Sequence, residues 1–261
     1  MTSNSLHRLA LVFALALVAG IAPARAVQFR LLAWGSYDLN LQFQNGKGAQ
    51  ELAVFPKSFS ITYEIPQGPI VLFKTVEVDG KPQRQTACTI VVPPEIQQAL
   101  VILVPADDSN APYRKVLPNS QGLVSKEAAL LYDCVVLDNS PAAHPVGTIE
   151  FRNFSRLPIA INIADRQLTL PPRDKTQVPI TEGAKRMAFR AAAQLENGDW
   201  KLLSSSPLPI SGAGRVLVIL RDRPEKSSRP DEPNIAIVPL FDWTPPPSPE
   251  PVAPQQVSYR R

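Results

Sequence analysis

Proline restricts the folds open to this chain more than any other residue. The sequence has 28 Pro against 12 Gly in 261 residues, so more than one residue in ten is proline. A proline inside a helix removes a hydrogen-bond donor and clashes with the preceding turn, which costs about 3 kcal/mol. Long helices are therefore excluded from most of the chain. A hydrophobic fraction of 44% and a charged fraction of 19% also exclude a chain that is disordered throughout.

The amino-terminal segment has the pattern of a secretory signal. Arg8 precedes an apolar run from Leu9 to Ala22, and Ala24 and Ala26 are small residues at the two positions that a signal peptidase reads. We expect residues 1–26 to be a signal peptide and the product to be periplasmic or secreted. The apolar run has 14 residues, fewer than the roughly 20 that a membrane-spanning helix needs. No transmembrane segment is therefore expected.

Period-two alternation predicts β-strands along the rest of the chain. In Val27–Leu31 and Leu39–Phe43 every second residue is apolar, as in strands with one buried face. Asn45-Gly46, Asp79-Gly80 and Asn197-Gly198 each separate two strand-like runs. Both residues of such a pair tolerate positive φ, so each pair predicts a hairpin.

Two short motifs recur in the same order in both halves of the sequence. Val27-Gln28-Phe29-Arg30 resembles Ile149-Glu150-Phe151-Arg152, and Leu-Val-Ile-Leu occurs at 100–103 and again at 217–220. The spacings between the copies are 122 and 117 residues. Chance matches of four apolar residues do occur in β-rich chains, but two matches in register favour an internal repeat.

The predicted fold class is all-β, with two tandem antiparallel immunoglobulin-like β-sandwiches. We expect the first sandwich at residues 27–139 and the second at 140–243. Six of the 18 residues from 244 to 261 are Pro, so this segment is expected to be a disordered tail.

The two cysteines lie in strand-like runs. Export would place Cys88 and Cys134 in an oxidising compartment, where they could form a disulfide. The alternative is a pair of buried thiols that pack as small hydrophobic side chains.

Most kinds of catalytic and metal-binding chemistry lack the residues they need. After residue 26 the chain has one histidine, His144, which lies in the proline-containing segment between the predicted sandwiches. No Gly-x-Ser-x-Gly elbow occurs, and a chance grouping accounts for Asp138 and Ser140 near His144. We therefore expect no enzymatic activity, no cofactor and no zinc site.

With residues 1–26 removed, 25 basic and 23 acidic residues remain. This small basic excess argues against nucleic-acid binding.

Two further features of the sequence are candidate binding sites. Carboxylates follow both Leu-Val-Ile-Leu runs, at 107–108 and at 222–232, as calcium loops would need. Basic residues compete in the second loop, so we interpret both as solvated loops and expect no metal. Trp34 and Tyr37 lie in the turn after the first strand, where exposed rings could bind a ligand, although a ring that caps the core is the alternative.

Two families are similar to this sequence in different ways. A secreted pair of β-sandwiches resembles the periplasmic pilus chaperones in outline, but their arginine and lysine anchor pattern and alternating donor-pairing strand have no counterpart here. The runs 29–33 and 147–155 resemble uncharacterised secreted bacterial proteins with duplicated immunoglobulin-like domains. This resemblance covers most of the chain after residue 26. It implies the duplicated fold and carries no activity or site.

These observations lead to an expected function. We expect an exported, non-enzymatic binding or structural module of the bacterial envelope, whose partner is an envelope protein or a glycan. The alternatives are a carbohydrate-binding accessory protein and a periplasmic strand-donating assembly chaperone. The two would differ in whether aromatic rings line a sheet or an unpaired strand edge lines the cleft between the sandwiches.

The signal-peptide interpretation predicts cleavage after Ala26, because Val27 begins the first alternating strand. Amino-terminal sequencing of the exported protein should therefore give Val27 as the first residue. A mature start beyond Phe29 would contradict the interpretation of that strand.

Overall fold

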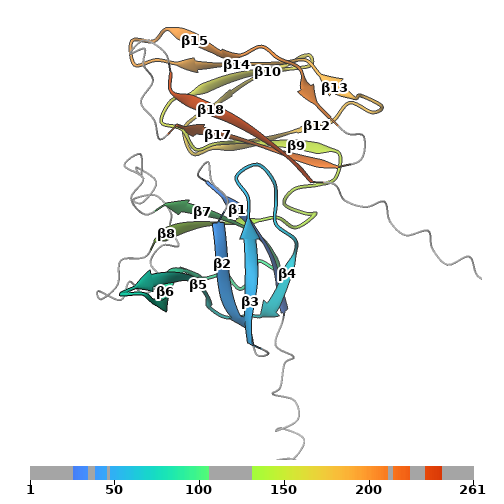
Figure 1. The fold of residues 1–261 in the computed structure, drawn as a ribbon. Coiled ribbons are helices and arrows are strands. Elements are labelled where there is room, and N and C mark those ends of the chain that lie inside the picture. The colour runs from blue at the N-terminus through green and yellow to red at the C-terminus, as the bar shows by residue number, and fades with distance from the viewer. Residues whose placement is uncertain are drawn as a thin grey trace, which may run out of the picture.

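The computed structural model describes residues 26–34, 39–45, 48–105, 131–210, 214–223 and 233–242 (Figure 1). Within these residues the chain forms 18 strands and no helix, so the all-β prediction is confirmed. Accordingly, the described part of the chain has no helix long and apolar enough to span a membrane. The predicted signal peptide, except for Ala26 at the start of β1, and the proline-rich tail lie outside the described residues.

The amino-terminal half contains two four-stranded sheets. Sheet A consists, in spatial order, of β4 (Tyr63–Pro66), β1 (Ala26–Ala33), β7 (Gln98–Pro105) and β8 (Tyr132–Asp138). Sheet B consists of β3 (Gly48–Val54), β2 (Leu39–Asn45), β5 (Ile70–Val78) and β6 (Lys81–Ile90).

The carboxy-terminal half repeats this arrangement and adds a small sheet. Sheet C consists of β12 (Lys175–Pro179), β9 (Thr148–Asn153), β17 (Arg215–Asp222) and β18 (Ile235–Asp242). Sheet D consists of β11 (Arg166–Leu170), β10 (Ile159–Ile163), β14 (Phe189–Gln194) and β15 (Trp200–Ser204). Two short strands, β13 (Arg186–Met187) and β16 (Leu208–Pro209), pair beside them.

The Asn-Gly and Asp-Gly pairs lie at or next to the connections between antiparallel strands. Asp79 and Gly80 have φ values of 52° and 73° and connect β5 to β6 as a two-residue loop. Asn197-Gly198 connects β14 to β15, with Gly198 at φ 88°. Strands β2 and β3 also pair as a hairpin, but Asn45 is the last residue of β2 and pairs with Gly48, and Gly46 lies outside the described residues. Local turn chemistry therefore sets the direction of these strands.

Each half has its own hydrophobic core between two sheets. In the first half Phe29, Leu31 and Phe43 are at most 2% exposed, and the Phe29 and Phe43 rings meet edge to face at 6.0 Å. In the second half Phe151 of β9 stacks on Phe189 of β14 with ring centroids 6.0 Å apart. The alternation along each strand directs these side chains into the core, so both halves have a β-sandwich-like arrangement.

A third hydrophobic cluster joins the two halves, and we call it the interface cluster. It lies between the outward faces of sheets A and C, which Figure 1 shows one above the other. Strands β7 and β17 are buried on both faces, because one face meets its own core and the other meets the opposite half. The members of the interface cluster at most 9% exposed are Leu32, Trp34, Leu100, Ile102, Val104, Val135, Leu137, Leu217, Ile219 and Leu240.

The repeated Leu-Val-Ile-Leu motif occupies the same place in both halves. In β7, Leu100 and Ile102 belong to the interface cluster, whereas Val101 and Leu103 belong to the first core. The motif in β17 divides in the same way, with Leu217 and Ile219 in the interface cluster and Val218 and Leu220 in the second core.

The other repeated motif matches less closely. Arg30 of β1 lies opposite Leu100 of β7. Arg152 of β9, its match in sequence, lies opposite Ile219 of β17 rather than Leu217. The two halves therefore differ by two residues in the register of this strand pair.

The expectation of purely antiparallel sheets is wrong for one pair in each half. Strands β1 and β7 are parallel, and so are β9 and β17. Between the partners of each pair the chain passes through the strands of the facing sheet. A connection of that length can return a strand in the same direction, whereas a two-residue hairpin can only reverse it.

Trp34 packs inside the interface cluster. It is 4% exposed, and its ring meets Phe154 of the second half edge to face at 5.4 Å. The guanidinium carbon of Arg221 lies 5.0 Å from the centroid of the same ring. The ring therefore belongs to the contact between the halves.

We expect Trp34→Ala to lower the free energy of unfolding by about 3–5 kcal/mol, because it removes a large buried ring. The matched control is Trp200→Ala, since Trp200 is 44% exposed on β15 and should contribute much less. Urea denaturation measures both values. Equal losses for the two variants would contradict the placement of Trp34 in the interface cluster.

Candidate functional site

The contact between sheets A and C changes from apolar to polar along the strands. At its polar end the outward positions hold Arg30 of β1 and Gln98 of β7, opposite Arg215 of β17 and Asp242 of β18. A cavity of about 430 Å³ opens here, between the two halves. We call it the interface cavity. Its volume lies in the range of small-molecule sites, about 300–1,000 Å³.

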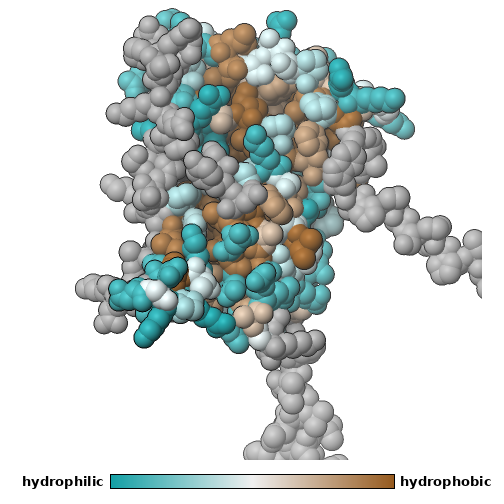
Figure 2. All heavy atoms as spheres, in the orientation of Figure 1, coloured by the Kyte–Doolittle hydropathy of each residue, from teal (hydrophilic) through white to brown (hydrophobic). Residues whose placement is uncertain are grey.

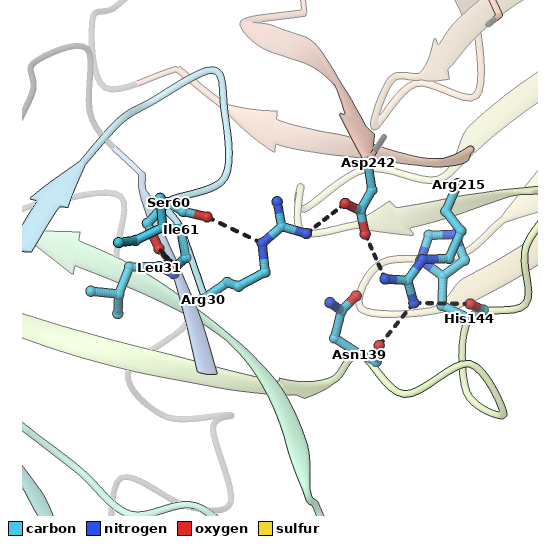
Figure 3. Close-up of polar contacts among 8 residues, drawn as sticks. All are labelled: Arg30, Leu31, Ser60, Ile61, Asn139, His144, Arg215 and Asp242. Atoms are coloured by element: carbon cyan, nitrogen blue, oxygen red, sulfur yellow. Dashed lines mark hydrogen bonds and ion pairs between the residues drawn. The ribbon is translucent and has the colours of Figure 1, made fainter. Parts of the chain in front are cut away.

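Asp242 lies between two guanidinium groups, one from each half (Figure 3). Arg30 Nη1 donates to Oδ1 at 2.6 Å, and Arg215 Nη2 donates to Oδ2 at 2.5 Å. Burial raises the pKa of Asp242, but the hydrogen bonds and charges of Arg30 and Arg215 outweigh burial and leave the pKa below its ordinary value. Asp242 is therefore ionised at neutral pH, and these three side chains carry a net charge of about +1.

The Arg30 side chain is held in one orientation. Its Nε donates to the carbonyl oxygen of Ser60 at 3.2 Å, and its guanidinium carbon lies 4.5 Å from the centroid of the Phe59 ring. Ser60 is in turn fixed to β1, because its Oγ accepts from the Leu31 N–H at 2.8 Å and its own N–H donates to the Leu31 carbonyl at 3.0 Å. Segment 59–60 therefore orients Arg30 toward Asp242.

Arg215 is the more deeply buried of the two arginines, with 7% of its surface exposed. Its Nη1 donates to the carbonyl oxygens of Asn139 at 2.9 Å and His144 at 3.2 Å. These acceptors belong to residues 139–147, which connect β8 of the first half to β9 of the second. We call this segment the connecting turn. Within the described residues, Arg215 Nε has no hydrogen-bond partner. One arginine thus binds Asp242 and the connecting turn together.

Asp138 and Ser140 serve the backbone of the connecting turn. Asp138 Oδ1 accepts from the Ser140 N–H at 2.9 Å, and Ser140 Oγ accepts from the Ala143 N–H at 3.2 Å. The carboxylate and the hydroxyl therefore cap a turn. This geometry agrees with the interpretation that their proximity to His144 in sequence is a chance grouping.

His144 is buried, with 5% of its surface exposed. Burial lowers the pKa of its imidazole, the Glu150 carboxylate acts in the opposite direction, and the charges of Arg215 and Arg152 lower it further. The ring is therefore neutral at pH 7. Its Nε2 has no hydrogen-bond partner in the described part of the chain, and its carbonyl oxygen is the group that meets Arg215.

A second polar group lies on sheet C beside the connecting turn. Glu150 is 2% exposed, and its carboxylate accepts from Arg152 Nε and, at 2.6 Å, from Gln177 Nε2. Gln177 Nε2 also donates to the carbonyl oxygen of Ala143 at 2.6 Å. These contacts link the connecting turn to β9 and β12, and both carboxylate oxygens of Glu150 accept hydrogen bonds in them.

A larger cavity, of about 770 Å³, lies in the first half and is lined by residues of β2, β3 and β5. Phe55, Ile61 and Tyr63 complete its wall. Burial raises the pKa of Tyr63, partly offset by a backbone hydrogen bond from Ala53. Unlike the interface cavity, it receives residues from one half only. Figure 2 shows apolar and polar residues mixed over both halves on the face that it presents.

Cys88 of β6 and Cys134 of β8 are free thiols in the structure, so the disulfide considered from the sequence is not formed here. The two are neighbours across the first core, because Cys134 Sγ lies 3.8 Å from the carbonyl oxygen of Thr89. A hydrogen bond with Cys134 is the largest cause of the raised pKa of the Cys88 thiol, and burial adds to it. Cys88 is buried in the first core and Cys134 is partly buried against it, which is closer to the alternative interpretation of two thiols that pack as small hydrophobic side chains.

The predicted aromatic ligand site does not form at Trp34. Its ring is buried because Phe154 and Arg221 of the second half pack against it, so the expectation of an exposed ring there is wrong. Tyr37 lies outside the described residues.

The acidic loops considered for calcium fall largely outside the described residues, including 107–108 and 224–232. Asp222 is described, and it pairs with Arg156 at 3.2 Å. Within the described ranges no group of three or more His, Cys, Asp or Glu side chains is placed to hold a metal ion.

Sequence reasoning missed Arg30, Arg215 and Asp242 as a group. Arg215 begins β17 and Asp242 ends β18, whereas Arg30 lies within β1, between Phe29 and Leu31. A charged residue in or next to an apolar run is unusual, because charged side chains are rarely buried without a partner. That pattern was a usable signal. It gave no indication that the three side chains meet, because they lie as far as 212 residues apart in sequence.

Comparison with known proteins adds no identification. No protein-family model matches the sequence, and no curated protein matches it.

We expect Asp242→Asn to lower the free energy of unfolding at pH 7 by about 3–5 kcal/mol, because it leaves two arginines facing no carboxylate. The folded-state pKa of Asp242 lies below its unfolded value of about 4. The carboxylate therefore stabilises the fold fully above that unfolded pKa, and the contribution is lost as pH falls through the folded-state pKa. The difference between wild type and variant should thus narrow below about pH 4.

Denaturant titrations at a series of pH values measure this difference. Asp165→Asn is the matched control, because Asp165 is exposed in the turn between β10 and β11 and should change stability by less than about 0.5 kcal/mol. A difference between wild type and Asp242→Asn that stays constant on acidification would contradict the ionised state assigned to Asp242.

Proposed function

We propose that this chain is an exported, non-enzymatic binding module of the bacterial envelope, and that its ligand occupies the interface cavity. In this proposal residues 1–26 are a signal peptide, and 27–139 and 140–243 are tandem immunoglobulin-like sandwiches. Residues 244–261 are a disordered tail. The two separate cores and the shared position of the Leu-Val-Ile-Leu motif support the tandem arrangement.

One observation carries the binding function: the interface cavity is walled by charged groups that both halves hold rigidly. Arg30 is fixed by Ser60 and Phe59, and Arg215 is fixed by the connecting turn. Asp242 links the two arginines. A site with preorganised polar groups loses little conformational entropy when a ligand binds, which is what a binding protein requires.

The same contacts favour binding over catalysis. A general base needs a lone pair that can reach the substrate, but each Asp242 oxygen already accepts a charge-assisted bond from an arginine. The low pKa of Asp242 makes it a weak base at neutral pH. The groups in the cavity are therefore suited to hold a ligand unchanged.

The two alternatives from the sequence fare differently. Uncharged polar side chains in the cavity, including Gln28, Thr62 and Gln98, favour a carbohydrate ligand because amides and hydroxyls match sugar hydroxyls. A strand-donating chaperone is not favoured at this site. Strands β1 and β7, which form one wall, are each paired on both sides and offer no free edge to another strand.

The proposal predicts that a residue filling the interface cavity abolishes ligand capture. Thr62 is an exposed residue of the cavity wall, so Thr62→Trp should obstruct it with little effect on the core. Thr169→Trp on β11 is the matched control, because Thr169 is exposed on sheet D. Native mass spectrometry measures capture from the small-molecule fraction of an envelope extract.

We expect wild type and Thr169→Trp to carry a bound compound that Thr62→Trp lacks. The compound should be released with its mass unchanged. Equal capture by all three proteins would contradict the placement of the site, absence of capture by wild type would contradict the binding function, and a released compound of altered mass would contradict the non-enzymatic assignment.

A further inference from the structure

The interface cavity has a surplus of positive charge that the protein itself leaves available. Its charged wall residues are Arg30, Arg215 and Asp242, so one positive charge is not neutralised there. Arg30 uses two of its five N–H groups, on Ser60 and Asp242, and the other three have no partner among the described residues. In Figure 3 one terminal nitrogen of Arg30 points away from both of these acceptors.

The rest of the cavity wall is polar and uncharged. Gln28, Thr62, Gln98 and Asn139 contribute three amides and one hydroxyl, and within the described residues no side chain of these four makes a hydrogen bond. Amides and hydroxyls both donate and accept hydrogen bonds. They can therefore bind hydroxyl groups, which also do both.

The charged and uncharged groups lie at matching positions of the two halves. Arg215 pairs with Asp242 at the start of β17, two residues before Leu217. At the same distance before Leu100, the backbone carbonyl of Gln98 accepts the backbone N–H of Asn139, so these two residues are neighbours. The second half thus contributes the Arg215–Asp242 ion pair to the cavity, and the first half contributes Arg30 together with the uncharged side chains. A ligand that matches it has one anionic group and an uncharged, hydroxylated body.

A peptide matches this cavity less well. Peptides are commonly bound by pairing with a free strand edge and by apolar side-chain sites. The wall strands β1 and β7 have no free edge. The exposed apolar residue of the wall is Ile61, at 71% exposure, and the buried Phe29 and Ala99 belong to the first core.

We propose that the interface cavity binds a uronate, a sugar acid, with its carboxylate on Arg30 and its hydroxyls on the amides of Gln28, Gln98 and Asn139. This inference rests on the proposed binding function. The cavity volume of about 430 Å³ accommodates a monosaccharide unit, whether free or at the end of a glycan.

The test is calorimetric titration of the purified exported chain with three probes. D-glucuronate carries both the carboxylate and the hydroxyls, D-glucose lacks the carboxylate, and N-acetylglycine lacks the hydroxyls. A hydrogen bond to a charged group corresponds to about a 10- to 100-fold change in affinity. Glucuronate should therefore bind about 10- to 100-fold more tightly than glucose, and also more tightly than N-acetylglycine.

Three arginine variants locate the carboxylate. Arg30→Gln should weaken glucuronate binding about 10- to 100-fold and leave glucose binding nearly unchanged. Arg30→Lys should restore part of the affinity, because it keeps the charge without the planar group. Arg84→Gln is the matched control, since Arg84 is exposed on β6 and contacts Gln44 at 3.3 Å, away from the cavity wall. It should bind glucuronate as wild type does.

Gln28→Met is a second variant that tests the same site if Arg30→Gln does not fold. It removes one amide from the cavity and leaves the contacts of Asp242 intact, so glucuronate should bind about fivefold more weakly. Unchanged affinity in this variant would place the sugar elsewhere.

The remaining outcomes separate this inference from the proposed function. Glucose binding as tightly as glucuronate would overturn the role of Arg30, and N-acetylglycine binding as tightly would point to a peptide-type carboxylate instead. If no probe binds but Thr62→Trp still abolishes capture from the envelope fraction, the uronate inference fails while the binding function stands.

Discussion

The structure depends on the burial of β7 and β17 on both faces. Each is one of the two inner strands of its four-stranded sheet, with one face in its own core and the other in the interface cluster. A half that stood alone would expose Leu100 and Ile102, or Leu217 and Ile219, to water. Burying an aliphatic side chain contributes about 1.5–3 kcal/mol, so the two halves have a strong reason to pack together. That packing fixes the positions of all groups around the interface cavity.

The charged groups at the polar end add specificity to this apolar contact. Asp242 is 8% exposed and would be costly to bury without partners. Its partners come from both halves, Arg30 from β1 and Arg215 from its own sheet. Sliding or rotation of one sheet over the other would separate Asp242 from Arg30. The apolar contact thus provides much of the stabilisation, while the ion pairs select one arrangement of the halves.

The strands and turns could be predicted from sequence because their signals are local. The predicted strands Val27–Leu31 and Leu39–Phe43 lie within β1 and β2, and Asp79-Gly80 forms the predicted hairpin. The parallel pairs could not be predicted, because partner choice depends on where the chain returns after some tens of residues. The prediction of an exposed Trp34 ring is wrong for a related reason. A turn position suggested exposure, but a surface supplied by the other half covers it.

The candidate site could not be predicted from local sequence patterns either, because its residues are brought together by the packing of the two halves. Leu100–Leu103 is apolar at every position instead of alternating, which is typical of a strand covered on both faces, and β7 is buried in this way. Once two such strands are placed against each other, the polar residues that begin them, Gln98 and Arg215, lie at the same end of the contact, and Asp242 of β18 pairs with Arg215 there. Arg215 and Asp242 could then have been selected as candidates from the ends of their strands. Arg30 required the register of β1 against β7, which the sequence does not encode locally.

The two-residue difference in register between the halves has a consequence for how such a chain can change over evolutionary time. Side chains on a strand alternate with period two, so a slip of two positions keeps each side chain on its own face. Phe151 remains in the core and Arg152 remains outside it, although their opposite neighbours on β17 have changed. A slip of one position would instead turn Phe151 outward and bury the guanidinium of Arg152. An insertion or deletion of two residues in these strands therefore preserves the division between core and outward side chains, whereas a change of one residue exchanges the two faces.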